Sequence, residues 1–315
     1  MKKDANISFL YISIYTLFCK LNFKLQNMST LKDWITDENP TKKKYSLAIN
    51  DNIYREQNSH YYKSMKTFNL IVAIVHTTSF VALLILSLVN LERVRIVRSW
   101  IEINRGDTIQ QIGEYPLFAT LLPFPAITAI FHIMAYLNVD NYYYSVLTNN
   151  INRLRWIEYG ITNGLITISL CFLVGCGNVV TVIVLVFCYF LMQCFGYLHE
   201  KFNSQLSNQE KSMRYLLIGF LPWIQIWAVI FTYYGLNMMD TSPLYESFAV
   251  FGSFFLSLLF VFPLVWRYYK KTNANNDKQF NYTTEIMYII LSLTAKLYLD
   301  WTVTIGNLVE TSDDD

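Results

Sequence analysis

The segment Leu291-Ser292-Leu293-Thr294-Ala295-Lys296-Leu297 places one lysine near the middle of an apolar stretch that runs from about 283 to 308. Such a stretch is long enough to cross a bilayer as a helix, which needs about 20 mainly apolar residues. A charged side chain at that depth costs roughly 3 kcal/mol on insertion scales, and it indicates a function by default. Lys296 is therefore the first candidate for a functional residue.

Six further apolar segments precede this one, and polar or charged residues close each of them. They run roughly over 67–90, 115–138, 143–173, 178–199, 213–239 and 243–266. Hydrophobic residues make up 53% of the 315 residues and charged residues 15%, whereas soluble domains carry about 25% charged residues. The pattern predicts an all-α membrane protein, a seven-helix rhodopsin-like bundle in the lipid bilayer. The net charge of +2 gives no reason to expect nucleic acid as a partner.

The chain divides into three parts by composition. Residues 1–65 form an N-terminal extension and polar linker of unknown role, residues 66–310 form the bundle, and residues 311–315 form an acidic tail. The five cysteines all lie in apolar runs, where free cysteine commonly acts as a small buried hydrophobe. We therefore expect neither a disulfide framework nor a metal site.

Basic residues in the loops predict the orientation, because cytoplasmic loops carry an excess of lysine and arginine. If the N-terminus is inside, the inner loops hold nine basic residues: Arg153, Arg155, Lys201, Lys211, Arg214, Arg267, Lys270, Lys271 and Lys278. The outer side then holds only the four arginines of the long loop 91–114. The N-terminus is therefore predicted to be cytoplasmic and the C-terminus extracellular.

A second charge lies in the third apolar segment, within Arg155-Trp156-Ile157-Glu158-Tyr159. Lys296 and Glu158 are either a structural ion pair, which by itself is weak evidence for a function, or parts of a chromophore site. In the second case Lys296 carries retinal as a protonated Schiff base, and Glu158 is the anion that stabilises the positive charge.

The motifs around both residues resemble those of microbial rhodopsins, and in their details those of the heliorhodopsin family. That resemblance rests on Glu158 as counterion, Ser292 one turn before the lysine, the histidines His76 and His132, and the N-inside orientation. It covers roughly residues 66–310 and implies all-trans retinal on Lys296, a slow sensor-like photocycle and a homodimer. Outward proton pumps place a carboxylate 11 residues after the counterion; Ser169 occupies that position, so a standard pump is not expected.

Candidate neighbours of the retinal come from four segments. We expect Thr162 and Asn163 near Glu158, Ser292 near Lys296, and aromatic or proline residues of the fifth and sixth segments along the polyene: Trp223, Trp227, Phe260 and Pro263. For each aromatic residue the alternative is simple packing or contact with lipid, since 17% of the chain is aromatic.

Several titratable residues are candidates for proton movement. His76 and His132 either line a polar cavity near the Schiff base or only hydrogen-bond across helices, and histidine titrates near neutrality. Asp300 lies one turn beyond Lys296 on the same helix face; it either begins an acidic route outward with Glu246 or bonds to Trp301 or a neighbouring hydroxyl. Glu246 is expected to be solvated, and His199 to be an interfacial residue. The role of Glu200 stays open.

The favoured function is a light-absorbing photoreceptor whose output is a conformational change. The alternative is a light-activated proton channel or transporter that uses the same residues. A third possibility is a seven-helix protein without a chromophore, such as a membrane enzyme or a scaffold. The sequence contains no phosphate-binding glycine loop, no His-Glu-x-x-His and no Gly-x-Ser-x-Gly, so an enzyme is not expected.

Overall fold

The computed structural model describes residues 60–89, 100–105, 108–115, 118–204, 206, 211–237, 244–269 and 277–313. They all belong to one compact unit, Glu56–Asp315. The expected extension over 1–65 therefore lies almost entirely outside the described residues, as does Cys19.

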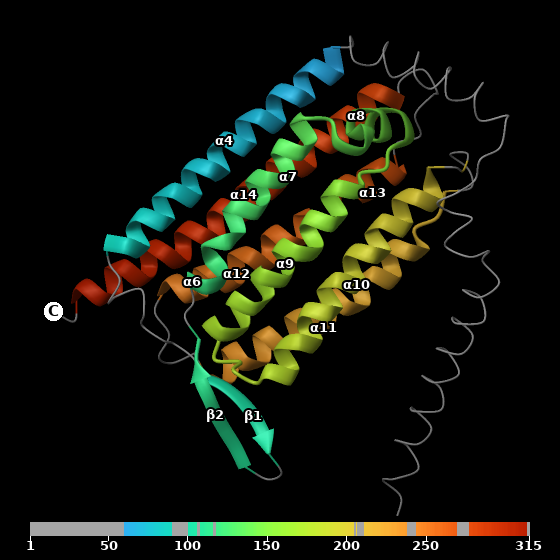
Figure 1. Cartoon of the computed structure of the whole chain (residues 1–315). Helices are drawn as coiled ribbons and strands as arrows, with labels where there is room; N and C mark the ends of the chain where they lie inside the picture. Colours follow the sequence, from blue (N-terminus) through green and yellow to red (C-terminus); the bar gives the residue numbers. More distant parts are fainter. Residues whose placement is uncertain are drawn as a thin grey trace, which may run out of the picture. The chain divides into compact units, whose positions relative to one another are not determined.

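Long helices dominate the described unit (Figure 1). They are α4 (His60–Val89), α7 (Pro123–Tyr136), α9 (Arg153–Leu173), α10 (Val179–Asn203), α11 (Arg214–Asn237), α12 (Leu244–Leu259), α13 (Phe262–Tyr269) and α14 (Asp277–Asp313), with short turns α6 (Phe118–Leu121) and α8 (Tyr142–Tyr144). Six helical segments are long and apolar enough to cross a membrane: His60–Val89, Arg153–Leu173, Val179–Asn203, Arg214–Asn237, Leu244–Arg267 and Lys278–Gly306. The apolar helix Pro123–Tyr136 is shorter.

Polar side chains are buried inside the bundle, and many large apolar ones are exposed. The buried polar residues include His76, Glu158, Lys296 and Asp300, whereas the exposed fractions of Leu221 and Phe255 are 65% and 61%. A soluble protein rarely exposes so much contiguous apolar surface. The surface therefore fits a hydrocarbon environment, and the chain is an integral membrane protein.

Asparagine caps fix the starts of the two central helices. The Asn152 side chain accepts a hydrogen bond from the Arg155 backbone N–H at 2.9 Å, and Asn178 does the same for Thr181 at 3.1 Å. These caps satisfy N–H groups that the first helical turn leaves unpaired. Between the two helices, Gly175 turns the chain with φ of 78°, a conformation that glycine adopts without strain.

Two proline positions shape the other helices. Pro222 lies inside α11 without ending it, which a bundle tolerates because neighbouring groups satisfy the freed carbonyl. The α12 helix stops at Leu259, and α13 begins three residues later at Phe262, just before Pro263. Because proline cannot donate the helical hydrogen bond, the sixth apolar segment is broken at this point.

The structure differs from two of the sequence expectations. Residues 143–173 are not one helix, because Asn150 takes left-handed backbone angles and α9 starts only at Arg153. The stretch 91–114, expected to be a loop, contains an antiparallel hairpin of β1 (Trp100–Arg105) and β2 (Thr108–Glu114). The Glu102 backbone N–H donates to the Gly177 carbonyl at 2.9 Å, so the hairpin lies beside the turn between α9 and α10 (Figure 1).

Helix α14 packs against α4 and α12, α7 packs between α4 and α9, and α10 packs between α9 and α11. Both α4 and α14 run the length of the bundle, and the C-terminus lies at the end opposite to the start of α4 (Figure 1). The polar residues that matter below come mainly from the facing sides of α7, α9 and α14.

Candidate functional site

Lys296 lies on α14 with 2% of its surface exposed. Its Nζ donates to the carboxylate of Glu158 on α9 and, at 3.0 Å, to the hydroxyl of Thr128 on α7. The two charges predicted to be buried in the membrane are therefore ion-paired. Thr128, which the sequence did not single out, brings a third helix to the amine.

Aromatic rings surround the charged amine. Nζ lies 5.3 Å from the centroid of the Tyr159 ring and 5.7 Å from that of Phe124. A cation within about 6 Å of an aromatic face is attracted by the ring quadrupole. The lysine head is thus held by one carboxylate, one hydroxyl and two rings.

A large cavity with about 1040 Å³ of empty space opens beside the amine, and Lys296 forms part of its wall. Small-molecule sites usually have mostly apolar walls with a few polar groups. Here α9, α10, α11, α12 and α14 supply the walls, which include Trp156, Tyr159, Asn163, Tyr189, Trp223, Trp227, Phe260 and Tyr288. Among the residues predicted to surround retinal, Asn163, Trp223, Trp227 and Phe260 line this cavity.

The aromatic walls are themselves fixed by packing. The ring of Phe254 lies 5.4 Å from Trp223 and 5.2 Å from Trp227, and the Trp223 indole N–H donates to the Ser257 hydroxyl at 3.1 Å. Phe260 meets Tyr159 edge-on at 5.5 Å. Rings held in this way give the cavity fixed, mainly apolar walls.

A second, smaller cavity with about 320 Å³ of empty space is lined by Glu158. Its walls are more polar and include Asn69, His132, Tyr142, Asn152, Arg155, Glu285 and Ser292. Tyr159 and Tyr288 line both cavities. These two tyrosines therefore lie between the aromatic and the polar space, and the Lys296–Glu158 pair joins the two.

The predicted histidines lie together. Their rings stack with centroids 6.3 Å apart, and His132 Nδ1 is hydrogen-bonded to the Asn69 side-chain oxygen at 2.8 Å. His132 lines the polar cavity. Neither ring nitrogen of His76 has a hydrogen-bond partner among the described residues, although the side chain is fully buried.

Ser292 and Thr162 differ in their surroundings. Ser292 lines the polar cavity. Thr162 lies in neither cavity wall. Its hydroxyl donates to the Glu158 backbone carbonyl at 2.9 Å within α9. Ser169, at the position where pumps carry a carboxylate, hydrogen-bonds to Thr120 at 2.6 Å.

On the far side of Lys296, Asp300 is fully buried, and its two carboxyl oxygens have no hydrogen-bond partner among the described residues. Trp301 is not its partner, because the indole N–H donates to Ser79 at 3.1 Å. The expectation that Glu246 is solvated was wrong: it is 2% exposed, since α12 places it inside the bundle. His199, near the end of α10, is buried and hydrogen-bonds to Asn203.

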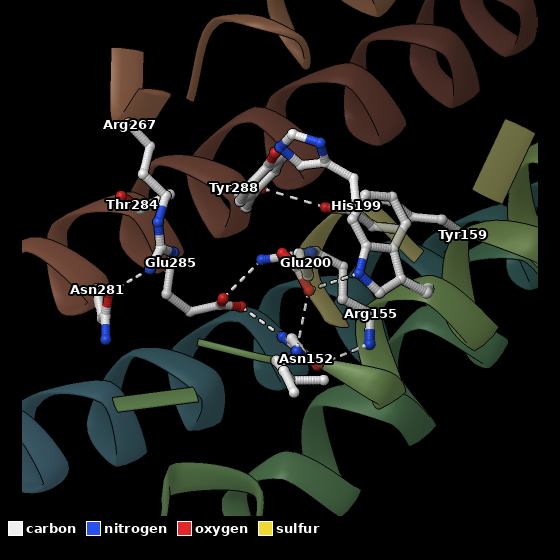
Figure 2. Close-up of polar contacts among 12 residues, drawn as sticks. Asn152, Arg155, Tyr159, His199, Glu200, Arg267, Asn281, Thr284, Glu285 and Tyr288 are labelled. Atoms are coloured by element: carbon white, nitrogen blue, oxygen red, sulfur yellow. Dashed lines mark hydrogen bonds and ion pairs between the residues drawn. The ribbon is translucent and has the colours of Figure 1, made fainter. Parts of the chain in front are cut away.

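A buried charge cluster lies beside the polar cavity (Figure 2). Arg155 pairs with the carboxylate of Glu200 on α10 and donates from Nη1 to Glu285 on α14 at 2.6 Å. Its guanidinium carbon also lies 3.9 Å from the centroid of the Tyr288 ring. This gives Glu200 a defined place as a partner of Arg155. Glu285 was missed because it lies at the edge of the expected segment 283–308, where a charge usually reaches water.

The described residues contain no group of three or more histidine, cysteine, aspartate or glutamate side chains placed to hold a metal ion. The four cysteines among them are free.

Taken together, a helical membrane bundle with a buried lysine–carboxylate pair at the wall of an aromatic cavity defines a rhodopsin-like protein. Comparison with solved structures supports that class: xanthorhodopsin, described as a light-driven ion pump with a dual chromophore, aligns with a TM-score of 0.55 over 81% of this chain and 96% of its own. The sequence identity is 14%, so this likeness concerns the fold alone.

The family follows from the sequence. The heliorhodopsin family model matches residues 65–308, and the chain belongs to the heliorhodopsin family. The predicted membership is thereby confirmed. None of the curated proteins matches the chain in sequence. Family and fold support a retinal-binding, light-sensing membrane protein rather than an enzyme of a conventional class.

Proposed function

We propose that this protein is a photoreceptor in which Lys296 Nζ carries all-trans retinal as a protonated Schiff base, with Glu158 as its counterion. The observation that carries the proposal is the position of Nζ: it lies at the wall of the large aromatic cavity and is paired with a carboxylate that faces the polar cavity. When bound, retinal supplies visible absorption and isomerisation by light.

The residues of this chain have separate tasks in that mechanism. A protonated Schiff base keeps a single N–H, which donates to Glu158, and this carboxylate stabilises the positive charge at Nζ. The Thr128 hydroxyl, which lies 3.0 Å from Nζ of the free lysine, places a dipole beside the same charge. Trp223, Trp227 and Phe260 hold the polyene and exclude water. Because the aromatic walls are fixed, a change in the shape of the bound molecule moves Nζ relative to Glu158 and Thr128. This movement breaks the buried charge-assisted hydrogen bond at Nζ and drives the bundle toward a second arrangement.

The test is reconstitution. Adding all-trans retinal to the purified full chain is expected to produce a visible absorption band, and Lys296→Ala is expected to abolish it. Lys201→Ala, which removes a lysine outside both cavity walls, serves as the matched control and keeps the band. A band that persists in Lys296→Ala, or the absence of any band in the wild type, contradicts the proposal.

The membrane arrangement belongs to the same proposal. We infer that α6 and α7 together form the span that completes seven, and that the N-terminus lies inside, as the loop charges predict. Protease accessibility of the two termini in sealed vesicles tests the orientation. The homodimer implied by the family is tested by the mass of the detergent-solubilised protein.

A second function, light-activated proton conduction, is favoured by one observation. Asp300 is fully buried one helical turn beyond Lys296, and its carboxyl oxygens have no hydrogen-bond partner among the described residues. A buried carboxyl group without partners is costly unless it holds a proton or water. If the protein conducts protons, illumination produces a photocurrent that Asp300→Asn reduces. A coloured, well-expressed protein without photocurrent is a sensor only.

A further inference from the structure

The polar cavity connects the Lys296–Glu158 pair to a second buried carboxylate. Glu158, His132 and Ser292 line it, and so does Glu285, which lies 11 residues before Lys296 on the same helix. Its polar walls are compatible with internal water, which needs several polar partners. A proton that leaves the ion pair therefore has a polar route toward Glu285.

The cluster around Glu285 carries an excess of negative charge. Arg155 is the one cation that contacts Glu200 and Glu285 among the described residues, so one positive charge faces two carboxylates. Both carboxylates are at most 4% exposed. If one of the two carboxylates takes up a proton, the remaining one balances Arg155. This is favourable because an unbalanced buried charge is costly.

The two carboxylates differ in the groups that face them (Figure 2). Glu200 accepts from Arg155, from the Trp156 indole N–H at 2.7 Å and from the Asn152 backbone N–H at 3.1 Å. All three groups are donors only. A proton placed on Glu200 would therefore meet another proton at each contact.

Glu285 has one contact that can reverse. Its Oε2 accepts from Arg155, but its Oε1 accepts from the Asn152 amide at 2.6 Å and from the Tyr142 hydroxyl at 3.2 Å. A tyrosine hydroxyl can donate or accept. Burial, together with the nearby charge of Glu285, holds the pKa of Tyr142 well above its ordinary value, so that group stays a neutral hydroxyl.

We propose that Glu285 is an internal proton acceptor that is ionised before illumination and takes up the proton lost from the Lys296–Glu158 pair. This inference rests on the proposed function, because the proton is released only when light acts on the retinal-bound site. The N–H bond at Lys296 Nζ breaks, an O–H bond forms at Glu285 Oε1, and no electrons are transferred. The Tyr142 hydroxyl turns from donor to acceptor, while Glu200 stays ionised as the partner of Arg155.

Other titratable groups surround this carboxyl. They are Arg155 and Tyr159 on α9, Glu200 on α10, Tyr142 on α8, Tyr288 on α14, and His132 across the cavity on α7. Arg267 on α13 donates to Asn281, one turn before Glu285, and is a more distant cation of the same region. The competing acceptor is His132. A proton there creates a new buried cation beside the stacked ring of His76, whereas a proton on Glu285 neutralises an existing excess anion. Charge balance therefore favours Glu285.

Light-minus-dark infrared spectroscopy of the retinal-reconstituted full chain tests the assignment. We expect a positive carboxylic C=O band that appears as the protonated visible form is lost. Glu285→Gln abolishes this band, whereas the matched variant Glu200→Gln keeps it and His132→Asn keeps it. Tyr142→Phe shifts its frequency, because the new O–H group loses its acceptor.

Failure of this inference differs from failure of the proposed function. A chain without a visible band contradicts the proposed function. A coloured chain whose carboxylic band is missing, persists in Glu285→Gln, or disappears only in His132→Asn overturns Glu285 as the acceptor.

Discussion

Replacing Gly196 with alanine is expected to disturb the site through Trp156. Gly196 is buried in α10, and a Cβ built there would lie 2.2 Å from Cζ3 and 2.4 Å from Cη2 of the Trp156 indole. Because ordinary contacts begin at about 3.4 Å, the ring has to move by about 1 Å. Its indole N–H would then lose the 2.7 Å hydrogen bond to Glu200.

The magnitude follows from these two losses. Overpacking a well-packed interior costs about 1–3 kcal/mol, and a hydrogen bond to a charged group contributes about 1.5–3 kcal/mol. Gly196→Ala is therefore expected to lower the free energy of unfolding by roughly 2.5–6 kcal/mol if both are lost. Because Trp156 also lines the aromatic cavity, the visible band should shift as well.

The assay is unfolding of the retinal-bound protein in a denaturing detergent, followed by absorption. Gly235→Ala is the matched control, because a Cβ at that exposed position of α11 would meet nothing within 4 Å. It should be neutral or stabilising by up to about 1 kcal/mol, since alanine favours helices over glycine. In a Trp156→Phe background, Gly196→Ala should cost less, because the smaller ring leaves room. The reasoning is refuted if Gly196→Ala and Gly235→Ala have equal stability.

Three further changes address single contacts. Glu158→Gln should shift the visible band to the red, because the anion that stabilises the charge at Lys296 is lost; an unshifted spectrum excludes Glu158 as counterion. Thr128→Val keeps the side-chain shape but removes the hydroxyl that lies 3.0 Å from Nζ of the free lysine. Absorption spectroscopy should therefore show a smaller shift in the same direction, and a shift to the blue would contradict this role. Asn178→Ala should lower the unfolding free energy by about 1 kcal/mol through loss of the α10 cap. The visible band should not move, because Asn178 lies in neither cavity wall. A shifted band would show that the turn between α9 and α10 is coupled to the site.

The ion pair was predictable because its members stand out. Lys296 and Glu158 are charges within apolar segments, and each needs a partner that only the other supplies at similar depth. Thr128 was not predictable in this way, because threonine is common in membrane helices and its role depends on the approach of α7 to α14. Glu285 lay near the end of an expected span, where position alone does not separate a solvated charge from a buried one.

Helix ends were predicted less well than helix cores. The apolar and tyrosine-rich stretch before Asn152 has a helical composition, yet four Asn and Asp residues there adopt left-handed angles. Asparagine and aspartate tolerate such angles better than most residues. The start of α9 after these turns depends on the cap by Asn152 and on the contacts of Asn152 with Glu200 and Glu285. These residues become neighbours only in the folded bundle.

The Arg155 cluster also suggests how a change at Lys296 reaches the rest of the bundle. Arg155 on α9 holds α10 through Glu200 and α14 through Glu285. If Glu285 takes up a proton, Arg155 stays balanced by Glu200, but its contact with Glu285 weakens from an ion pair to a hydrogen bond with a neutral acid. This weakening should loosen the first turns of α14, from Asp277 to Glu285, while the half beyond Lys296 stays packed.

Hydrogen–deuterium exchange under illumination measures this loosening directly. Amides of residues 277–288 should exchange faster in the light, and those of 297–305 should change little. In Glu285→Gln the contact with Arg155 already lacks the ion pair, so the first turns of α14 should exchange faster in the dark and respond weakly to light. An equal response to light in the wild type and in Glu285→Gln would show that the signal leaves the site by another route, such as the α7–α4 side through His132 and His76.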